Sequence, residues 1–405
     1  MEPGSVVEVA VSRSSSYPMI SVQEALSHVL QQSDALDAVD VPLSSCCGYR
    51  SWSEVCVKSP FPPFPASIMD GYALRAPLLA GAYPVQSRVR AGDAEGLELQ
   101  PGQVVYITTG ARVPPGADAV VKIEETSAMG DAATAGEDEE RVHIDVSVPL
   151  AGMNVRQVGS DMAVGELLLS AGQLIGAAEA GLLATAGVQA VQCFRRPLVG
   201  VLSTGSELVD PLSSAPLSGS QVRDSNRVAL LAALKADGYD ALDLGIVGDT
   251  EAALRAKLLE AVALADVLIT SGGVSMGDAD LVKPMLAELG TVHFGRLNMK
   301  PGKPTTFATV PRTHGRGKAL VFGLPGNPSS CLVAKALFVD PCLRRLQGDS
   351  SQQCLHTQMQ AALAGGALRL DPERAEYHRG VLQVHAGTGA VTVRSTGNQR
   401  SSRLL

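Results

Sequence analysis

The chain has 405 residues, of which 45% are hydrophobic and 18% are charged, so it is long enough for several domains and is not disordered in composition. Its formal net charge of −8 argues against a nucleic-acid-binding protein, because such a protein needs a basic face. The seven cysteines include no CxxC pair, which favours unpaired thiols in a reducing compartment over zinc sites or disulfides.

The N-terminal segment bears on the location of the protein. Residues 1–18 are rich in serine and predict a loose arm, and Met1-Glu2-Pro3-Gly4 has neither the basic segment nor the apolar core of a signal peptide. No uncharged apolar run reaches the ~18 residues that a membrane span needs. We therefore expect a cytosolic protein that binds neither membranes nor nucleic acid.

The first part of the chain changes from a helical to a β pattern and back. A helix is predicted over about 21–37, with Ser21 at the N-cap and Glu24 at the capping-box position. After the proline-rich SPFPPFPASIMDGYAL, residues 85–150 predict strands separated by Pro-Gly turns, and a second helix is predicted over about 174–190. The expected domains are a helical domain I over 19–55 and 151–194, and a β-rich domain II over 56–150.

From Pro197 onward, strands, loops and helices alternate, as in ADVLITSGGVSMGD and KALVFGLPGNPSSCLVAKALF. This alternation predicts a multidomain α/β protein with a parallel, doubly wound sheet in domain III, over 195–347. Short alternating runs such as AVTVRST predict a small barrel-like β domain IV over 348–405.

Four loops of the predicted sheet domain carry glycine, serine, threonine or lysine. They are Ser203–Glu207, Ser271–Asp280, MKPGKP at 299–304 and GLPGNPSS at 323–330. In a parallel sheet, loops of this kind gather at the carboxyl ends of the strands. Glycine-rich backbone and helix N-termini direct N–H groups at anions, and Lys300 and Lys303 add positive charge on a stiff Pro-Gly turn. The set predicts a site for phosphate or another tetrahedral oxyanion.

Each of these signals has a purely structural alternative. A glycine-rich loop can be only a tight turn, and two lysines can be a solvated surface. Asp249, Asp278 and Asp280 can cap helices, or they can hold Mg²⁺ together with phosphate oxygens. Their combination at one sheet edge favours a site for Mg²⁺ and phosphate. It is not a Walker loop, since GxxxxGK[ST] is absent from the sequence.

With PFPASIMDGYAL and VYITTGARVPPGADAVVKIEET upstream, these loops resemble the molybdopterin molybdenumtransferase family, which includes bacterial MoeA proteins, the plant molybdenum insertase E domain and the E domain of gephyrin. The motifs follow the family's order from about Ile20 to Leu405, and the ending STGNQRSSRLL is similar to the eukaryotic branch. Members of that branch continue further, so the resemblance implies that the chain stops inside domain IV. It also implies that domain III is molybdopterin-binding-like and that the G domain of the pathway is absent.

The motifs and the resemblance together assign roles to individual residues. Catalysis is assigned to Asp70, Glu207, Asp249 and Asp278, and Mg²⁺ binding to Asp249, Asp278 and Asp280. Substrate binding is assigned to Thr109, Arg156, Asp161, Thr204, Ser271, Gly272, Gly273, Ser275, Lys300, Lys303, Pro325, Asn327, Pro328 and Ser329. Two positions depart from the family pattern: Ser160 replaces a glutamate, and Ser206 stands where an acidic residue is frequent.

The activity that the resemblance implies is insertion of molybdate into adenylylated molybdopterin, which releases AMP and molybdenum cofactor with the help of Mg²⁺. It also implies a homodimer, whose site joins the sheet domain of one subunit to the N-terminal domains of its partner, and a G-domain adenylyltransferase that supplies the pterin. Two alternatives are a gephyrin-like scaffold and a non-catalytic pterin-binding module. The retained aspartates and lysines favour the enzyme.

Overall fold

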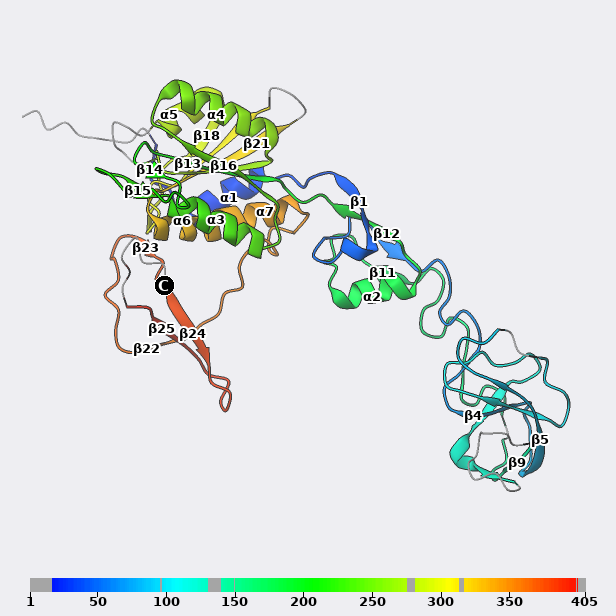
Figure 1. Ribbon diagram of the computed structural model, residues 1–405. Helices are drawn as coiled ribbons and strands as arrows, with labels where there is room; N and C mark the ends of the chain where they lie inside the picture. Colours follow the sequence, from blue (N-terminus) through cyan, green and yellow to red (C-terminus); the bar gives the residue numbers. More distant parts are fainter. Residues whose placement is uncertain are drawn as a thin grey trace, which may run out of the picture. The chain divides into compact units, whose positions relative to one another are not determined.

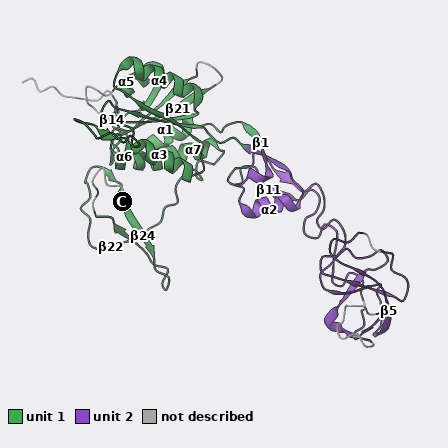
Figure 2. Cartoon of the chain, in the orientation of Figure 1, with its two compact units in different colours: residues 1–39, 48–50, 194–405 green, residues 40–47, 51–193 purple. Residues whose placement is uncertain are grey.

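A computed structural model describes residues 17–94, 97–129, 140–148, 150–274, 281–312, 317–397 and 399. The chain forms two compact units (Figures 1 and 2). Unit 1 comprises Met1–Val39, Gly48–Arg50 and Phe194–Leu405, and unit 2 comprises Asp40–Cys47 and Ser51–Cys193. In the described part of the chain, every helix is too short or too polar to cross a membrane. The described residues include all seven cysteines, and no disulfide joins them.

A six-stranded sheet forms the centre of unit 1, in the order β16-β13-β17-β21-β20-β18. The bounds of its strands are Ala241–Val247 for β16, Val199–Thr204 for β13, Val267–Ser271 for β17, Lys318–Leu324 for β21, Thr306–Pro311 for β20 and Thr291–Phe294 for β18. The first four strands run parallel to one another, whereas β20 and β18 are antiparallel to their neighbours.

The sheet is therefore mixed: β18 runs in the same direction as β16, β13, β17 and β21, as predicted, whereas β20 is reversed. The exception has a simple cause. Only residues 312–317 lie between β20 and β21, and a parallel pair needs a crossover of a dozen or more residues.

Helices cover both faces of this sheet (Figure 1). Side chains such as Leu202 and Leu268 pack against α4 (Glu251–Leu264) and α5 (Val282–Leu289). Their neighbours in the strands, such as Val201 and Ile269, point to the opposite face, as the period of two in a strand requires. The helices on that face are α1 (Val22–Gln32), α3 (Ser225–Ala236), α6 (Pro328–Ala334) and α7 (Asp340–Leu346), with the π-helical turn Lys335–Val339 between the last two.

Helix α1 begins as the sequence predicts but ends earlier than residue 37. The Ser21 hydroxyl accepts a hydrogen bond from the Glu24 N–H at 3.1 Å, which is the expected N-cap, and the helix stops at Gln32. Its buried residues Val22, Ala25 and Val29 belong to the core under the six-stranded sheet.

Unit 2 contains a second six-stranded sheet, in the order β7-β4-β6-β5-β9-β8. Its strands are β7 (Ala119–Lys122), β4 (Gly71–Leu74), β6 (Val104–Ile107), β5 (Gly81–Val89), β9 (Arg141–Ile144) and β8 (Thr126–Ala128), with the turn Ile123–Glu125 beside them. The other elements of the region are β1 (Ala38–Pro42), the turn Leu43–Ser45, β2 (Val55–Cys56), β3 (Ala66–Ser67), β10 (Val155–Arg156), β11 (Leu167–Leu169), α2 (Ala177–Thr185) and β12 (Ala190–Phe194). The β pattern predicted over 85–150 therefore forms a sheet.

The last part of unit 1 consists of short strands, as predicted. A three-stranded sheet has the order β22-β25-β24, with bounds Ala362–Ala364, Val391–Ser395 and Gly380–Val384. Strand β23 (Ala375–Glu376) pairs in parallel with β19 (Met299–Lys300) and so joins this segment to the predicted lysine loop.

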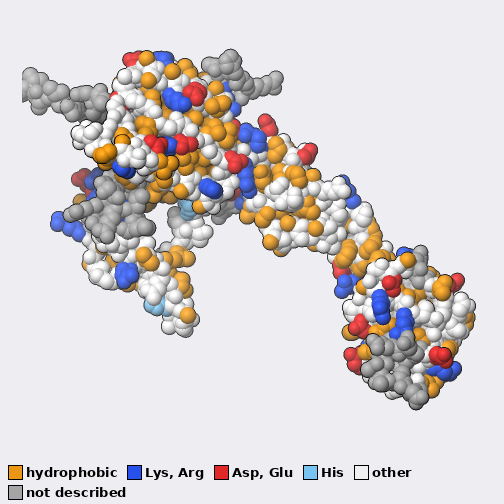
Figure 3. Space-filling model, viewed as in Figure 1, with side chains coloured by type: hydrophobic (Ala, Val, Ile, Leu, Met, Phe, Trp, Pro, Cys, Tyr) orange, Lys and Arg blue, Asp and Glu red, His pale blue; other side chains and the backbone are white. Residues whose placement is uncertain are grey.

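In the view of Figure 3, acidic and basic side chains are interspersed over the surface.

Candidate functional site

A cavity of about 490 Å³ opens at the carboxyl ends of the parallel strands in unit 1. The predicted residues that line it are Thr204, Glu207, Asp249, Gly272, Gly273, Pro325 and Asn327. They come from the loops that follow four different strands, β13, β16, β17 and β21. Loops far apart in the sequence thus meet at one sheet edge, as a doubly wound topology requires.

Two glycines allow the loop after β17 to approach β13 closely. Gly272 has φ +94°, and a Cβ atom there would lie 2.4 Å from the carbonyl oxygen of Thr204. Gly273 has φ +63°, and its Cβ atom would lie 2.8 Å from the Thr204 hydroxyl. Both the left-handed backbone and the lack of space exclude a side chain. The glycines are therefore required by the shape of the cavity wall.

Glu207 and Asp249 give the cavity two carboxylates. The Asp249 carboxylate accepts a hydrogen bond from the Ser206 N–H at 2.8 Å, and the Ser206 hydroxyl accepts one from the Asp249 N–H at 3.0 Å. Thr250, not Asp249, occupies the N-cap position of α4. Ser206, which departs from the family pattern, thus holds the predicted metal ligand in place.

The donor set of the cavity fits Mg²⁺ better than a bare anion. Among its described lining residues, the charged ones are the two carboxylates, with no Lys or Arg. Mg²⁺ takes oxygen ligands and is usually held by one or two carboxylates together with phosphate oxygens of the substrate. No group of three acidic, His or Cys side chains suited to a metal forms within the described residues. The predicted ligands Asp278 and Asp280, and the predicted substrate residue Ser275, lie outside those residues.

The loop after β21 is built around the start of α6. Asn327 caps this helix, since its side-chain oxygen accepts hydrogen bonds from the N–H groups of Ser329 at 3.1 Å and Ser330 at 3.3 Å. Pro328 is the first helical residue, where the missing N–H has no consequence. The hydroxyl of Ser329 accepts a hydrogen bond from Arg379 at 2.5 Å. The side chain of Asn327 is therefore engaged in organising the loop.

Ser271, at the end of β17, is buried beneath the cavity wall. Its hydroxyl accepts a hydrogen bond from the side-chain amide of Asn226 at 2.6 Å. The Cys331 thiol lies beside it, and burial raises the pKa of that thiol to about 12 although its hydrogen bond with Ser271 acts in the opposite direction. In this structure Ser271 is thus bonded within the protein interior.

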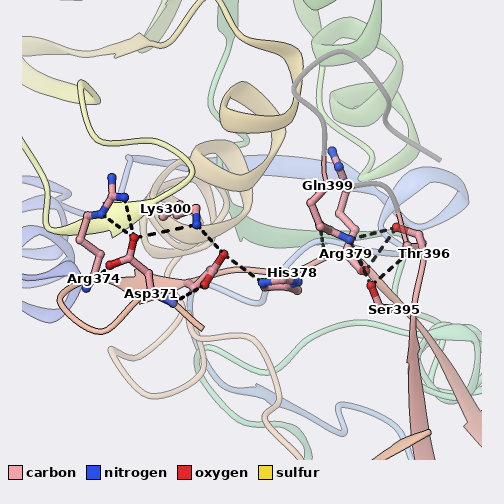
Figure 4. Close-up of polar contacts among 10 residues, drawn as sticks. Lys300, Asp371, Arg374, His378, Arg379, Ser395, Thr396 and Gln399 are labelled. Carbon is pink, nitrogen blue, oxygen red and sulfur yellow. Dashed lines mark hydrogen bonds and ion pairs between the residues drawn. The ribbon is translucent and has the colours of Figure 1, made fainter. Parts of the chain in front are cut away.

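Lys300 lies in a charged cluster with the C-terminal segment (Figure 4). Its ammonium group is 3.0 Å from the Glu376 carboxylate and 3.9 Å from that of Asp371. The hydrogen bond from Lys300 holds the pKa of the Glu376 carboxyl below its usual value, and His378 contacts the same carboxylate at 3.0 Å. Neither Lys300 nor Lys303 lines the cavity, although their neighbour Pro304 does.

The predicted residues of the N-terminal half pair with one another in unit 2. The Asp70 carboxylate accepts hydrogen bonds from the Thr109 N–H at 2.6 Å and from the Thr109 hydroxyl at 3.0 Å. Arg156 and Asp161 form an ion pair at 3.3 Å. The four residues that the motifs select in this half of the chain thus form two contacting pairs, Asp70 with Thr109 and Arg156 with Asp161.

The sequence motifs assign no role to several residues of the site. Those that line the cavity are Gly205, Val274, Pro304, Gly326 and Ser330, and those that hold its loops are Ser206, Asn226, Glu376 and Arg379. The lining residues sit next to assigned ones, so the motifs had located the loops. Glu376 and Arg379 are in the C-terminal β segment, where no sequence signal connects them to the sheet.

Two family models match the chain. Residues 20–187 match the MoeA N-terminal region (domain I and II), and residues 200–345 match a probable molybdopterin binding domain.

Individual relatives agree with these models. Gephyrin of Dictyostelium discoideum is 39% identical over 97% of this chain and 59% of its own length, so the chain spans less than two thirds of that relative. A molybdopterin molybdenumtransferase of Haemophilus influenzae is 32% identical over 95% of this chain and 91% of its own length. The crystal structure of a molybdopterin biosynthesis MoeA protein from Pyrococcus horikosii has a TM-score of 0.67 at 31% identity, over 82% of this chain and 81% of that one.

Proposed function

Because the chain belongs to the molybdopterin molybdenumtransferase family, we propose that it transfers molybdenum from molybdate to adenylylated molybdopterin, releasing AMP and molybdenum cofactor. The observation that carries this proposal is the cavity at the sheet edge, which gathers assigned residues from the loops after β13, β16, β17 and β21. Its volume of about 490 Å³ lies in the range typical of small-molecule sites.

Different residues of the cavity would bind the oxyanion and the Mg²⁺ ion. The backbone of Gly272 and Gly273 is free of side chains, so that an oxyanion can approach its N–H groups closely. Glu207 and Asp249 would hold Mg²⁺ in the cavity, together with Asp278 and Asp280, to which the sequence assigns the same role. When bound, Mg²⁺ supplies charge neutralisation for the phosphate oxygens of the pterin substrate. Asp249 is kept in position by Ser206.

Lys300 and Lys303 are proposed to bind molybdate near the cavity, together with the N–H groups of Gly272 and Gly273. Pro304 lines the cavity and Lys303 precedes it directly, so this loop lies at the site. Lys300 is 46% exposed and its partners Glu376 and Asp371 are carboxylates, so an incoming oxyanion competes with them for the ammonium group. A hydrogen bond between a charged donor and an anion is stronger than a neutral one.

Asp70, Thr109, Arg156 and Asp161 are proposed to reach the site of a partner subunit in a homodimer. The support for this is that each forms a defined pair in unit 2 while the cavity belongs to unit 1. The proposal also includes the four-domain division given above, a cytosolic location and a G-domain adenylyltransferase that supplies the adenylylated pterin.

The test is a single-turnover assay with purified protein, adenylylated molybdopterin, MgCl₂ and molybdate. We expect AMP release that requires all three additions, and formation of molybdenum cofactor that activates a cofactor-free molybdenum enzyme. Binding of the pterin without AMP release, in the presence of both Mg²⁺ and molybdate, would contradict the proposal and indicate a non-catalytic pterin-binding module.

A further inference from the structure

A buried amide joins two walls of the cavity. Asn226 lies in the first turn of α3 and is 8% exposed. Its Nδ2 atom donates hydrogen bonds to the Ser271 hydroxyl at 2.6 Å and to the Gly326 carbonyl oxygen at 2.9 Å. Ser271 ends β17, and Gly326 lies in the loop that follows β21. One side chain therefore connects the ends of two neighbouring strands.

The two segments that Asn226 connects are next to the substrate cavity. Gly326 lines the cavity, and Ser271 directly precedes the lining residues Gly272 and Gly273. The two segments also approach closely, since a Cβ atom on Gly326 would lie 3.6 Å from the Cα atom of Gly272. Asn226 itself is not part of the lining, so it acts on the cavity through its two hydrogen bonds.

The helix that carries Asn226 is firmly anchored. Asp224 caps α3 by accepting a hydrogen bond from the Arg227 N–H at 3.2 Å. The Arg227 guanidinium then contacts three carboxylates, those of Asp224 at 2.9 Å, Asp243 at 2.5 Å and Asp210 at 2.8 Å. The amide group is therefore presented from a fixed support.

Two polar atoms beside this contact have no partner among the described residues. They are the side-chain oxygen of Asn226 and the hydroxyl of Ser203, and both are buried. Ser203 pairs with Ser271 across the sheet, so both side chains point to the face that α3 covers. Buried polar atoms of this kind are usually satisfied by an internal water molecule. This polar spot lies beneath the cavity wall, within an otherwise apolar core.

We propose that Asn226 is a positioning residue, which holds the loop after β17 and the loop after β21 at the spacing that the oxyanion substrate requires. The inference deepens the proposed function and depends on it for the identity of the substrate. Gly272 and Gly273 have unusual freedom of the backbone, so ordering them before the substrate arrives needs a contact of this kind. Removing the amide leaves both the Gly326 carbonyl oxygen and the Ser271 hydroxyl without the N–H donor that Asn226 supplies.

The first test is Asn226→Ala, with isothermal titration of molybdate, the AMP-release assay and alkylation of Cys331 as readouts. We expect affinity for molybdate to fall about 10- to 100-fold, the effect of losing buried hydrogen bonds, and KM to rise more than kcat falls. Cys331 is buried against Ser271, so opening of the loop should also speed its reaction with iodoacetamide, measured by mass spectrometry.

The second test is Asn226→Asp, which keeps the shape of the side chain and removes the donor to Gly326. Burial raises the pKa of an introduced carboxyl, and its protonated form can donate again. We therefore expect the ratio of the variant's KM to that of the parent protein to fall towards one as the pH is lowered from 8 to 6. If Asn226 had no effect on substrate binding, this ratio of KM values would not change with pH. This variant also serves if Asn226→Ala does not fold.

The matched control is Gln347→Ala, which removes another partly buried amide donor, to Tyr239 at 2.7 Å. It should change neither molybdate affinity nor Cys331 alkylation. Unchanged molybdate affinity in folded Asn226→Ala, or a KM ratio for Asn226→Asp that does not vary with pH, would overturn the inference. If the parent protein neither binds molybdate nor releases AMP, the proposed function fails instead, and Cys331 alkylation still decides whether Asn226 holds the loops.

Discussion

Among single residues, Asp266 shows how a buried charge is tolerated at the sheet edge opposite to the cavity. Its carboxylate accepts hydrogen bonds from Arg195 at 2.7 Å and 2.9 Å, from Arg312 at 3.0 Å and from the Leu198 N–H at 2.8 Å. Burial raises the pKa of this carboxyl, but the hydrogen bonds outweigh it and hold the pKa below its usual value. The ionised form is therefore stabilised in the folded protein.

We predict that Asp266→Asn lowers the free energy of unfolding at pH 7 by about 3 kcal/mol, because it leaves Arg195 and Arg312 without their shared partner. A carboxyl whose pKa is lowered on folding contributes stability above its unfolded pKa, and loses it as the pH falls through the folded pKa. The difference between parent and variant should thus shrink below about pH 4. Urea unfolding at pH 7 and pH 3 measures it, and an equal difference at both pH values would contradict the role of the charge.

At the residue scale, the sequence predicted which loops form the site better than what each side chain does. Gly272 and Gly273 were identified because glycine in a strand-to-helix loop has a direct physical meaning. Asn327 and Ser271 were assigned to substrate, yet their side chains are bonded to α6 and to Asn226. A sequence motif does not distinguish a residue that touches a ligand from one that supports the loop, because both are polar and both occur in the same loop.

At the scale of elements, the C-terminal strands reach back to the sheet domain. Strand β23 pairs with β19, so that Glu376 is placed against Lys300. The Tyr377 N–H donates to the Lys300 carbonyl oxygen at 2.7 Å, and Arg379 reaches the start of α6. This segment therefore contacts two loops of the site, and the pairing explains why Lys300 faces carboxylates.

We predict that Glu376→Gln strengthens molybdate binding by about two- to fivefold, because the oxyanion no longer competes with the nearest carboxylate for Lys300. Glu373→Gln is the matched control, since it removes the same charge from the same segment without an ion pair to Lys300 among the described contacts. In a Lys300→Ala background, Glu376→Gln should have no effect on molybdate affinity. An increase of the same size in that background would show that the gain is a general charge effect.

Strand and helix periodicity predicted the elements of unit 1 well, and their pairing less well. The common direction of β16, β13, β17 and β21 follows from the strand-loop-helix alternation, whereas β20 runs antiparallel to both of its neighbours, β21 and β18. Direction depends on the length of the connection, and residues 312–317 are too few for a parallel crossover between β20 and β21. The contact between β23 and β19 could not be predicted, because two-residue strands give no periodic signal.

At the scale of the whole molecule, the assigned residues fall into both compact units. Asp70 belongs to unit 2, and Asp249 belongs to unit 1. The proposed homodimer accounts for this division if each site takes Asp70 from one subunit and Asp249 from the other. The four-domain division and the dimer both remain predictions.

We predict that Asp70→Asn and Asp249→Asn are each inactive alone. Mixing the two variants under conditions of subunit exchange should restore about a quarter of the parent activity. About half of the dimers are then mixed, and each mixed dimer has one intact site out of two. AMP release measures the activity, and native mass spectrometry verifies the exchange. Mixing Asp249→Asn with a chain that carries both substitutions should restore nothing. Mixed dimers without activity would contradict a shared site.

If molybdenum transfer occurs in the cavity at the sheet edge, AMP release depends on the carboxylate of Asp249, and the decisive measurement is AMP release by Asp249→Asn. Asparagine keeps the hydrogen bond from the Ser206 N–H but removes the charge that would hold Mg²⁺, so the melting temperature should be unchanged and AMP release should fall at least about 100-fold. Asp34→Asn, whose side chain is 87% exposed, should release AMP like the parent protein. Near-parent AMP release by folded Asp249→Asn would show that molybdenum transfer occurs elsewhere in the protein.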